Sequence, residues 1–182
     1  MEEQQSPFQA AIKPGITIGL VSLAITFIAY FIDSTLLASG WFLLISLIIF
    51  FALIIYFGQQ YRSELGGYMT FGTAFNFSFV AIIISGIIGL IGQLLLFNVV
   101  DPDLGAVLSD LNYNSQLAFM EQLGQNPDSM DPAALQAMKE GSESQYTFSG
   151  QLKGFGISII IYAIIALILG AILKKKDKSL EF

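Results

Sequence analysis

The stretch FGISIIIYAIIALILGAIL, residues 155–173, is followed directly by Lys174, Lys175 and Lys176, and it decides the class of the protein. The stretch contains no charged residue. As an α-helix it would be close to the roughly 30 Å thickness of the hydrocarbon layer of a bilayer. The run therefore predicts a transmembrane helix, and the lysines mark the end of that helix.

Three further apolar runs cover about residues 14–32, 37–57 and 70–99. Pro14 stands at the expected start of the first run, where the missing N–H of proline costs little. The residues before it are acidic and glutamine-rich, which favours a retained span over a signal peptide. In the second run, Trp41 suits the membrane interface. Four such runs predict an all-α membrane protein with four transmembrane helices in one integral membrane domain.

The third run is unusually long for a single crossing. If residues 70–99 were fully helical, they would extend roughly 45 Å. We therefore expect this span to tilt, to kink near Ser85 and Gly86, or to begin within the membrane interface.

Composition agrees with a bilayer environment and excludes several functions. Hydrophobic residues make up 54 % of the chain, charged residues only 12 %, and the mean hydropathy is +0.69. The chain has no cysteine and no histidine, which excludes disulfides, thiol nucleophiles, Cys/His zinc sites and imidazole acid-base chemistry. No basic surface suited to nucleic acid is evident beyond the short lysine tail.

The distribution of charge predicts an orientation. With four spans, one side of the membrane holds six basic residues: Lys13, Arg62, Lys174, Lys175, Lys176 and Lys178. The other side holds only Lys139 and Lys153. Because basic residues are retained on the cytoplasmic side, we expect both termini in the cytoplasm and residues 101–149 outside, in the periplasm of a didermic bacterium.

The segment between the third and fourth spans predicts two helices. Apolar residues recur at helical spacing from Leu104 to Leu123, and Gly124 is a plausible stop. Asp131 and Pro132 then resemble an N-cap and first helical residue of a second helix that ends near Gly141. Eight acids lie between Asp101 and Glu143 against one lysine. We expect an acidic extracytoplasmic insert of two helices.

Small residues mark faces where helices can approach closely. In the first span they recur in steps of three and four, and the third span has a similar set, so we expect these two spans to pack together. The alternative is a dimer face, because the first two glycines also fit a dimerisation pattern that is common by chance. The candidate packing residues are Gly15, Gly19, Ser22, Thr26, Ser78, Ser85 and Gly89.

Polar groups near the spans leave several interpretations open. Asn76, Gln93 and Asn98 could line a polar cavity, but interhelical hydrogen bonds are the commoner role. Asp101, Asp103 and Asp110 could bind calcium, although their spacing fits no recognised loop and a solvated acidic surface is favoured. The terminal lysines could bind anionic lipid head groups or serve only as an anchor.

The connection between the second and third spans is the most motif-like segment. Its Gly66-Gly67 pair permits positive φ and a sharp return into the bilayer, so it predicts a hinge that could also be a cytoplasmic docking site. A longer pattern includes this connection, and it consists of Arg62, Gly66, Gly67, Phe71 and Gly72 together with Asp101 and Pro102 after the third span. The pattern resembles the domain of unknown function 4199 family of bacterial membrane proteins. The resemblance implies an inner-membrane protein, chiefly of Bacteroidota, and it implies no activity, substrate or catalytic residue.

These observations favour a noncatalytic inner-membrane protein, acting as a partner, scaffold or accessory subunit of a membrane complex. We expect no catalytic, cofactor-binding or metal-binding residues, and contacts with the bilayer, with other membrane subunits or with a second copy. The alternative is a small oligomeric transporter or channel component built around Asn76 and Gln93. An intramembrane enzyme is least favoured, because no nucleophile, metal set or acid-base pair is evident.

Overall fold

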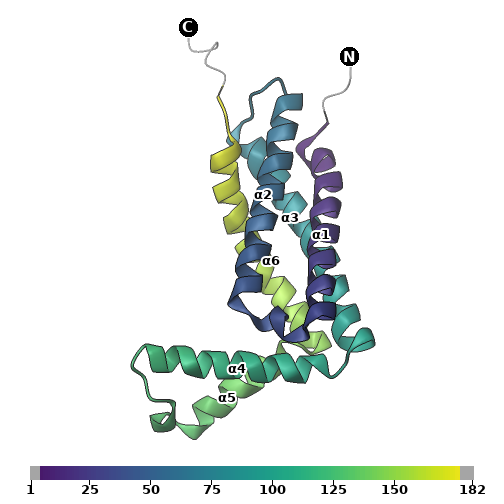
Figure 1. The fold of residues 1–182 in the computed structure, drawn as a ribbon. Coiled ribbons are helices and arrows are strands. Elements are labelled where there is room, and N and C mark those ends of the chain that lie inside the picture. Colours follow the sequence, from purple (N-terminus) through teal and green to yellow (C-terminus); the bar gives the residue numbers. More distant parts are fainter. Residues whose placement is uncertain (1–4, 177–182) are drawn as a thin grey trace. The chain divides into compact units, whose positions relative to one another are not determined.

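The computed structural model describes residues 5–176, and over this range the chain is almost entirely helical (Figure 1). The expected cytoplasmic Lys178 lies outside the described residues. Within residues 5–176, four helices or helical segments are long and apolar enough to cross a membrane: Pro7–Ile32, Gly40–Glu64, Phe71–Val100 and Phe148–Leu173. They correspond to α1 (Pro7–Ile32), α2 (Gly40–Glu64), α3 (Phe71–Leu95) with the π-helical turn Leu96–Val100, and α6 (Phe148–Leu173). The protein is therefore an all-helical, multi-pass membrane protein.

A hydroxyl residue directly precedes each of the four long helices. The hydroxyl oxygens of Ser6, Ser39, Thr70 and Thr147 accept hydrogen bonds from the backbone N–H groups of Gln9, Phe42, Thr73 and Gly150, at 3.3, 3.2, 3.2 and 3.1 Å. At Ser6 the cap is reciprocal, because Gln9 Oε1 accepts from the Ser6 N–H at 3.4 Å. Such caps satisfy backbone donors that have no partner within the helix.

These caps explain where the helices differ from the predicted runs. Because Ser6 and Gln9 form a capping box, α1 begins at Pro7, and Pro14 lies inside the helix rather than at its start. Thr147 likewise starts α6 before the predicted residue 155. In α3, regular α-helical structure continues past Ser85 and Gly86, and it changes to π-helical only after Leu95.

The second helix is displaced toward the C-terminus relative to the predicted run 37–57. The 3-10 helix η1 (Ser34–Ala38) comes first, and its start is capped by Asp33, whose side chain accepts from the Thr35 N–H at 2.9 Å. Ser39 then adopts an extended conformation with ψ of 139°, and α2 runs from Gly40 to Glu64. Two successive caps therefore interrupt the apolar sequence at a place where hydropathy alone indicates no break.

The segment between the third and fourth candidate spans contains two helices, α4 (Leu104–Gln122) and α5 (Pro132–Ser144), with the short 3-10 helix η3 (Pro127–Ser129) between them. Gly124 follows α4 with φ of +78°, the conformation that glycine adopts readily after a helix. Asp131 Oδ1 accepts from the Ala133 N–H at 2.9 Å and caps α5. In Figure 1, α4 and α5 lie side by side, and α4 also contacts η1.

The chain divides into two compact units, each with its own apolar core. Among the described residues, the first unit comprises 5–25, Ile45–Gly89 and 156–176. Its fully buried side chains include Ile18, Ile54, Phe77, Ile82, Leu169 and Leu173. Tyr61 stacks on Phe77 there, with ring centroids 5.1 Å apart.

The second unit comprises Thr26–Leu44 and Leu90–Phe155. Leu96, Leu104 and Leu108 form its buried centre, and side chains of α1, η1 and the π-helical turn pack against them. The fold therefore places α4 on a local apolar core, built from the ends of the neighbouring segments.

Candidate functional site

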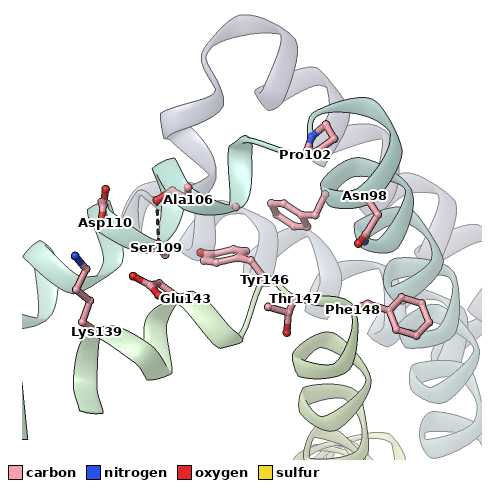
Figure 2. Close-up of a pocket in the computed structure, with 12 residues that line it drawn as sticks. Asn98, Pro102, Ala106, Ser109, Asp110, Lys139, Glu143, Tyr146, Thr147 and Phe148 are labelled. Carbon is pink, nitrogen blue, oxygen red and sulfur yellow. Dashed lines mark hydrogen bonds between the residues drawn. The ribbon is translucent and has the colours of Figure 1, made fainter. Parts of the chain in front are cut away.

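A cavity of about 710 Å³ opens in the second unit, between α4, α5 and the start of α6 (Figure 2). Its lining combines aromatic, amide, hydroxyl and charged side chains. The lining residues are Phe97, Asn98, Pro102, Gly105, Ala106, Ser109, Asp110, Lys139, Glu143, Tyr146, Thr147 and Phe148. A cavity with this mixture can bind a side chain or a small polar molecule.

Tyr146 forms the aromatic wall of this cavity (Figure 2). Its ring lies against Phe97, with centroids 5.0 Å apart and planes inclined at 57°. The side-chain amide of Asn112 donates a hydrogen bond to the Tyr146 hydroxyl. Burial raises the pKa of Tyr146, and the hydrogen bond from Asn112 only partly opposes this rise. Tyr146 therefore stays protonated at neutral pH and acts as a fixed, neutral surface.

Charged side chains gather at one end of the cavity (Figure 2). Asp110 comes from α4, whereas Lys139 and Glu143 come from one face of α5. The Ser109 hydroxyl, which would be the obvious nucleophile, donates to the Ala106 carbonyl oxygen at 2.9 Å. Its proton is therefore directed at the backbone rather than at a neighbouring carboxylate.

A smaller cavity of about 280 Å³ in the same unit contains Gln93. Gln145 and Gln151 also line it, so three amides face one space. Gln151 is only 6 % exposed, and its Nε2 donates to the Tyr146 carbonyl oxygen at 2.8 Å, whereas its Oε1 has no protein partner. Of the three amides that the sequence suggested for a polar cavity, only Gln93 lines this one, and Gln145 and Gln151 lie outside the predicted spans.

Asn76 does not join Gln93 in this cavity. The Asn76 side chain is exposed and belongs to the first unit, whereas Gln93 belongs to the second.

Among the three aspartates suggested as calcium ligands, Asp101 accepts two hydrogen bonds within the protein. Asp101 Oδ1 accepts from the Leu104 N–H at 3.1 Å, and its Oδ2 accepts from the Tyr30 hydroxyl at 3.1 Å. Within residues 5–176, no group of three or more potential metal-ligating side chains comes together. Asp101 thus serves the junction before α4.

The connection between α2 and α3 brings the motif residues to the end of α6. Arg62 Nη1 donates to the Leu173 carbonyl oxygen at 3.1 Å. Gly66 and Gly67 have φ of +84° and +89°, the conformation that the Gly-Gly pair predicts for a sharp turn. Phe71 is 42 % exposed and stacks on Phe75, whereas Gly72 meets open space. The Arg62 hydrogen bond therefore holds this connection against the end of α6, and Phe71 and Gly72 remain exposed.

The small-residue faces of α1 and α3 meet at two points. A Cβ atom at Gly15 would lie 2.8 Å from the Ala81 carbonyl oxygen, and one at Gly19 would lie 3.1 Å from Ser85 Cα. Ser78 and Ser85 are buried, whereas Ser22 and Thr26 are partly buried and have partners of their own. A Cβ at Gly89 would meet nothing, so this glycine takes no part in a close contact.

Comparison with known proteins identifies a family. No curated protein and no solved structure matches the chain significantly. A family described as "Protein of unknown function (DUF4199)" matches residues 13–175, which include the Arg62 to Gly72 turn, the Asp101-Pro102 junction, α4 and α5. This match covers most of the chain, and the protein therefore belongs to the DUF4199 family.

Proposed function

We propose that the protein is a noncatalytic accessory subunit of an inner-membrane complex, which binds a partner through its α4–α5 insert. In this proposal both termini are cytoplasmic and residues 101–149 are periplasmic. The orientation rests on the excess of basic residues at Lys13, Arg62 and the end of α6.

Exposed apolar side chains on α4 carry the proposal. Phe119 and Leu123 are 60 % and 63 % exposed, and their spacing of four residues puts them on one side of α4 and its C-terminal end. They lie outside the four candidate spans, where lipid would not be expected to cover them. An exposed apolar pair on a helix is a common anchor for a protein partner.

Charge identifies the chemistry of that partner. The segment from Asp101 to Glu143 contains eight acids and one lysine. Such a surface is repelled by anionic lipid head groups, so insertion of Phe119 and Leu123 into the bilayer is disfavoured. A periplasmic segment of another membrane protein, apolar at its centre and basic at its rim, complements the surface better.

Site-specific photo-cross-linking in native membranes tests this proposal. A benzophenone amino acid at Phe119 should yield one discrete adduct with a membrane protein whose periplasmic segment is basic. The matched control is the same probe at Gln136, an exposed residue of α5, which should yield none. The substitution Leu123→Ser should reduce the Phe119 adduct at unchanged expression. Adducts with lipid alone, or equal adducts from both positions, would contradict the accessory-subunit role.

Reporter fusions test the orientation separately. A fusion at Gln125, which lies between α4 and η3, should report the periplasm, and fusions at both termini should report the cytoplasm. A cytoplasmic report from Gln125 would reverse the topology and remove the insert from the periplasm.

The cavity that contains Gln93 favours a second candidate function, a small oligomeric transporter or channel component. Its three amides and the unpaired Gln151 Oε1 offer polar contacts to a solute. Gln93→Leu should then abolish solute flux while assembly stays intact, and Asn76→Leu should not, because Asn76 lies outside the cavity. Flux lost in this way would refute a purely noncatalytic scaffold role.

A further inference from the structure

A basic and aromatic pocket lies in the first unit, at the end of α6. Its volume is about 510 Å³, and its lining consists of Tyr68, Met69, Thr70, Phe71 and the three lysines 174–176, with no acidic residue. We propose that this pocket binds the phosphate head group of an anionic phospholipid in the adjacent leaflet.

The lysines are part of a fixed main-chain structure. Met69 and Lys175 form an antiparallel bridge, in which the Met69 N–H donates to the Lys175 carbonyl oxygen at 3.0 Å and the Lys175 N–H donates to the Met69 carbonyl oxygen at 2.8 Å. The Lys175 ammonium lies 5.8 Å from the centre of the Tyr68 ring, within the range of a cation–π interaction. The bridge holds the basic segment against the connection between α2 and α3, so less ordering is required when a ligand binds.

The C-terminus of α6 has a cationic partner other than the three lysines. Arg62 already donates to the Leu173 carbonyl oxygen, where the helix dipole is negative. The pocket also includes the residues at the N-terminus of α3, whose first turn contains no acid, and the positive end of that dipole adds to the charge of the lysines. The local potential therefore favours an anion.

The position and the apolar part of the pocket distinguish a lipid from a free anion. The pocket begins immediately after Leu173, the last residue of a candidate span, where head groups are expected. Phe71, at 42 % exposure, and Tyr68, at 43 %, offer apolar and aromatic surface beside the lysines. A phosphodiester with its glycerol and acyl chains can contact both parts, whereas inorganic phosphate uses only the charge.

Native mass spectrometry of the detergent-purified full chain tests the proposal. The probes are dioleoyl phosphatidylglycerol, dioleoyl phosphatidylcholine and inorganic phosphate. We expect preferential binding of phosphatidylglycerol. The triple variant K174Q/K175Q/K176Q should bind this lipid more weakly, by roughly a factor of five for each of the three lysines removed. The matched control is K139Q/K153Q, which removes lysines that do not line this pocket and should leave the affinity unchanged.

Two further variants keep the result interpretable if the triple variant folds poorly. K174R/K175R/K176R retains the charge and should bind phosphatidylglycerol. Tyr68→Leu removes the cation–π contact and should weaken binding without altering helicity by circular dichroism. Equal binding of the two lipids, equal loss in the control variant, or effective competition by inorganic phosphate would overturn the lipid site.

Discussion

The hydroxyl of Tyr30 donates a hydrogen bond to Asp101 Oδ2 at 3.1 Å and joins the end of α1 to the turn that precedes α4. The other carboxylate oxygen of Asp101 accepts from the Leu104 N–H at 3.1 Å. A single side chain therefore stabilises the start of α4 and connects it to a residue 71 positions earlier in the chain. Asp101 also belongs to the motif that indicated the family, and this double role gives its presence a structural reason.

Breaking this junction should lower thermal stability in two unequal steps. Tyr30→Phe removes one hydrogen bond and should lower the Tm slightly, whereas Asp101→Ala removes two and should lower it more. In the Asp101→Ala background, Tyr30→Phe should have little further effect, because its partner is already absent. Tyr56→Phe, at a residue that is 62 % exposed, is the control. A full additional loss in the double variant would contradict the coupling.

The glycines of the small-residue faces should respond differently to alanine. At Gly15 the added Cβ would lie 2.8 Å from both the Ala81 carbonyl oxygen and Ile84 Cβ, and the backbone atom cannot move without shifting α3. Gly15→Ala should therefore destabilise the chain by about 1–3 kcal/mol, the usual cost of overpacking. Gly89→Ala has open space and should be neutral or stabilising by up to about 1 kcal/mol, as expected for alanine within a helix.

Unfolding in mixed micelles, followed by circular dichroism, measures both glycine variants under one condition. Gly19→Ala should resemble Gly15→Ala, because its Cβ would lie 2.9 Å from Ile88 Cβ. If Gly89→Ala destabilised as much as Gly15→Ala, general loss of helix flexibility rather than contact between α1 and α3 would explain the effect.

The number of candidate spans could be predicted from the sequence, because each run is long and nearly free of charge. Helix starts were harder to predict, since hydropathy does not register a hydroxyl cap. The Ser6 to Gln9 spacing is a capping-box signal that would have placed the start of α1 at Pro7. Thr147, by contrast, follows a polar sequence, and only its hydrogen bond to the Gly150 N–H identifies it as a cap.

The cavities were less predictable than the helices. The sequence indicates Gln93 because this residue is polar within an apolar run. Gln145 and Gln151 also line the cavity, but they lie in a polar segment, where polarity alone does not distinguish them. Periodicity also selected Gly89 together with Gly15, although only Gly15 is close to another helix. Spacing defines a face of one helix, whereas contact depends on the path of the neighbouring helix.

Alanine at the Gly66-Gly67 turn should be costly because both residues have positive φ, at +84° and +89°. A side chain disfavours that region, so each substitution should destabilise the chain by about 1–2 kcal/mol. Gly72→Ala is the matched control, because Gly72 is helical and its Cβ would meet nothing. Equilibrium unfolding would measure the difference, and equal stability of Gly66→Ala and Gly72→Ala would show that the turn can relax.

Acid should weaken the cap of η1. The Thr35 hydroxyl donates to Asp33 Oδ1 at 2.7 Å and the Thr35 N–H donates to the same oxygen at 2.9 Å, and these bonds lower the pKa of Asp33. The folded state therefore holds the carboxylate form more strongly than the unfolded state. Its contribution to stability is complete above the ordinary pKa of about 3.9 and is lost as pH falls through the lower, folded value.

Trp41, the single tryptophan of the chain, lies just after η1 and can report this change by its fluorescence. The wild-type emission should shift as the solution is acidified below a pH of about 4, and Asp33→Asn should abolish the transition because the amide does not titrate. Thr35→Val removes the hydroxyl donor but keeps the backbone donor, so it should move the midpoint to higher pH, toward the ordinary value for aspartate. An unchanged midpoint in Thr35→Val would assign the low pKa to a group other than the Thr35 hydroxyl.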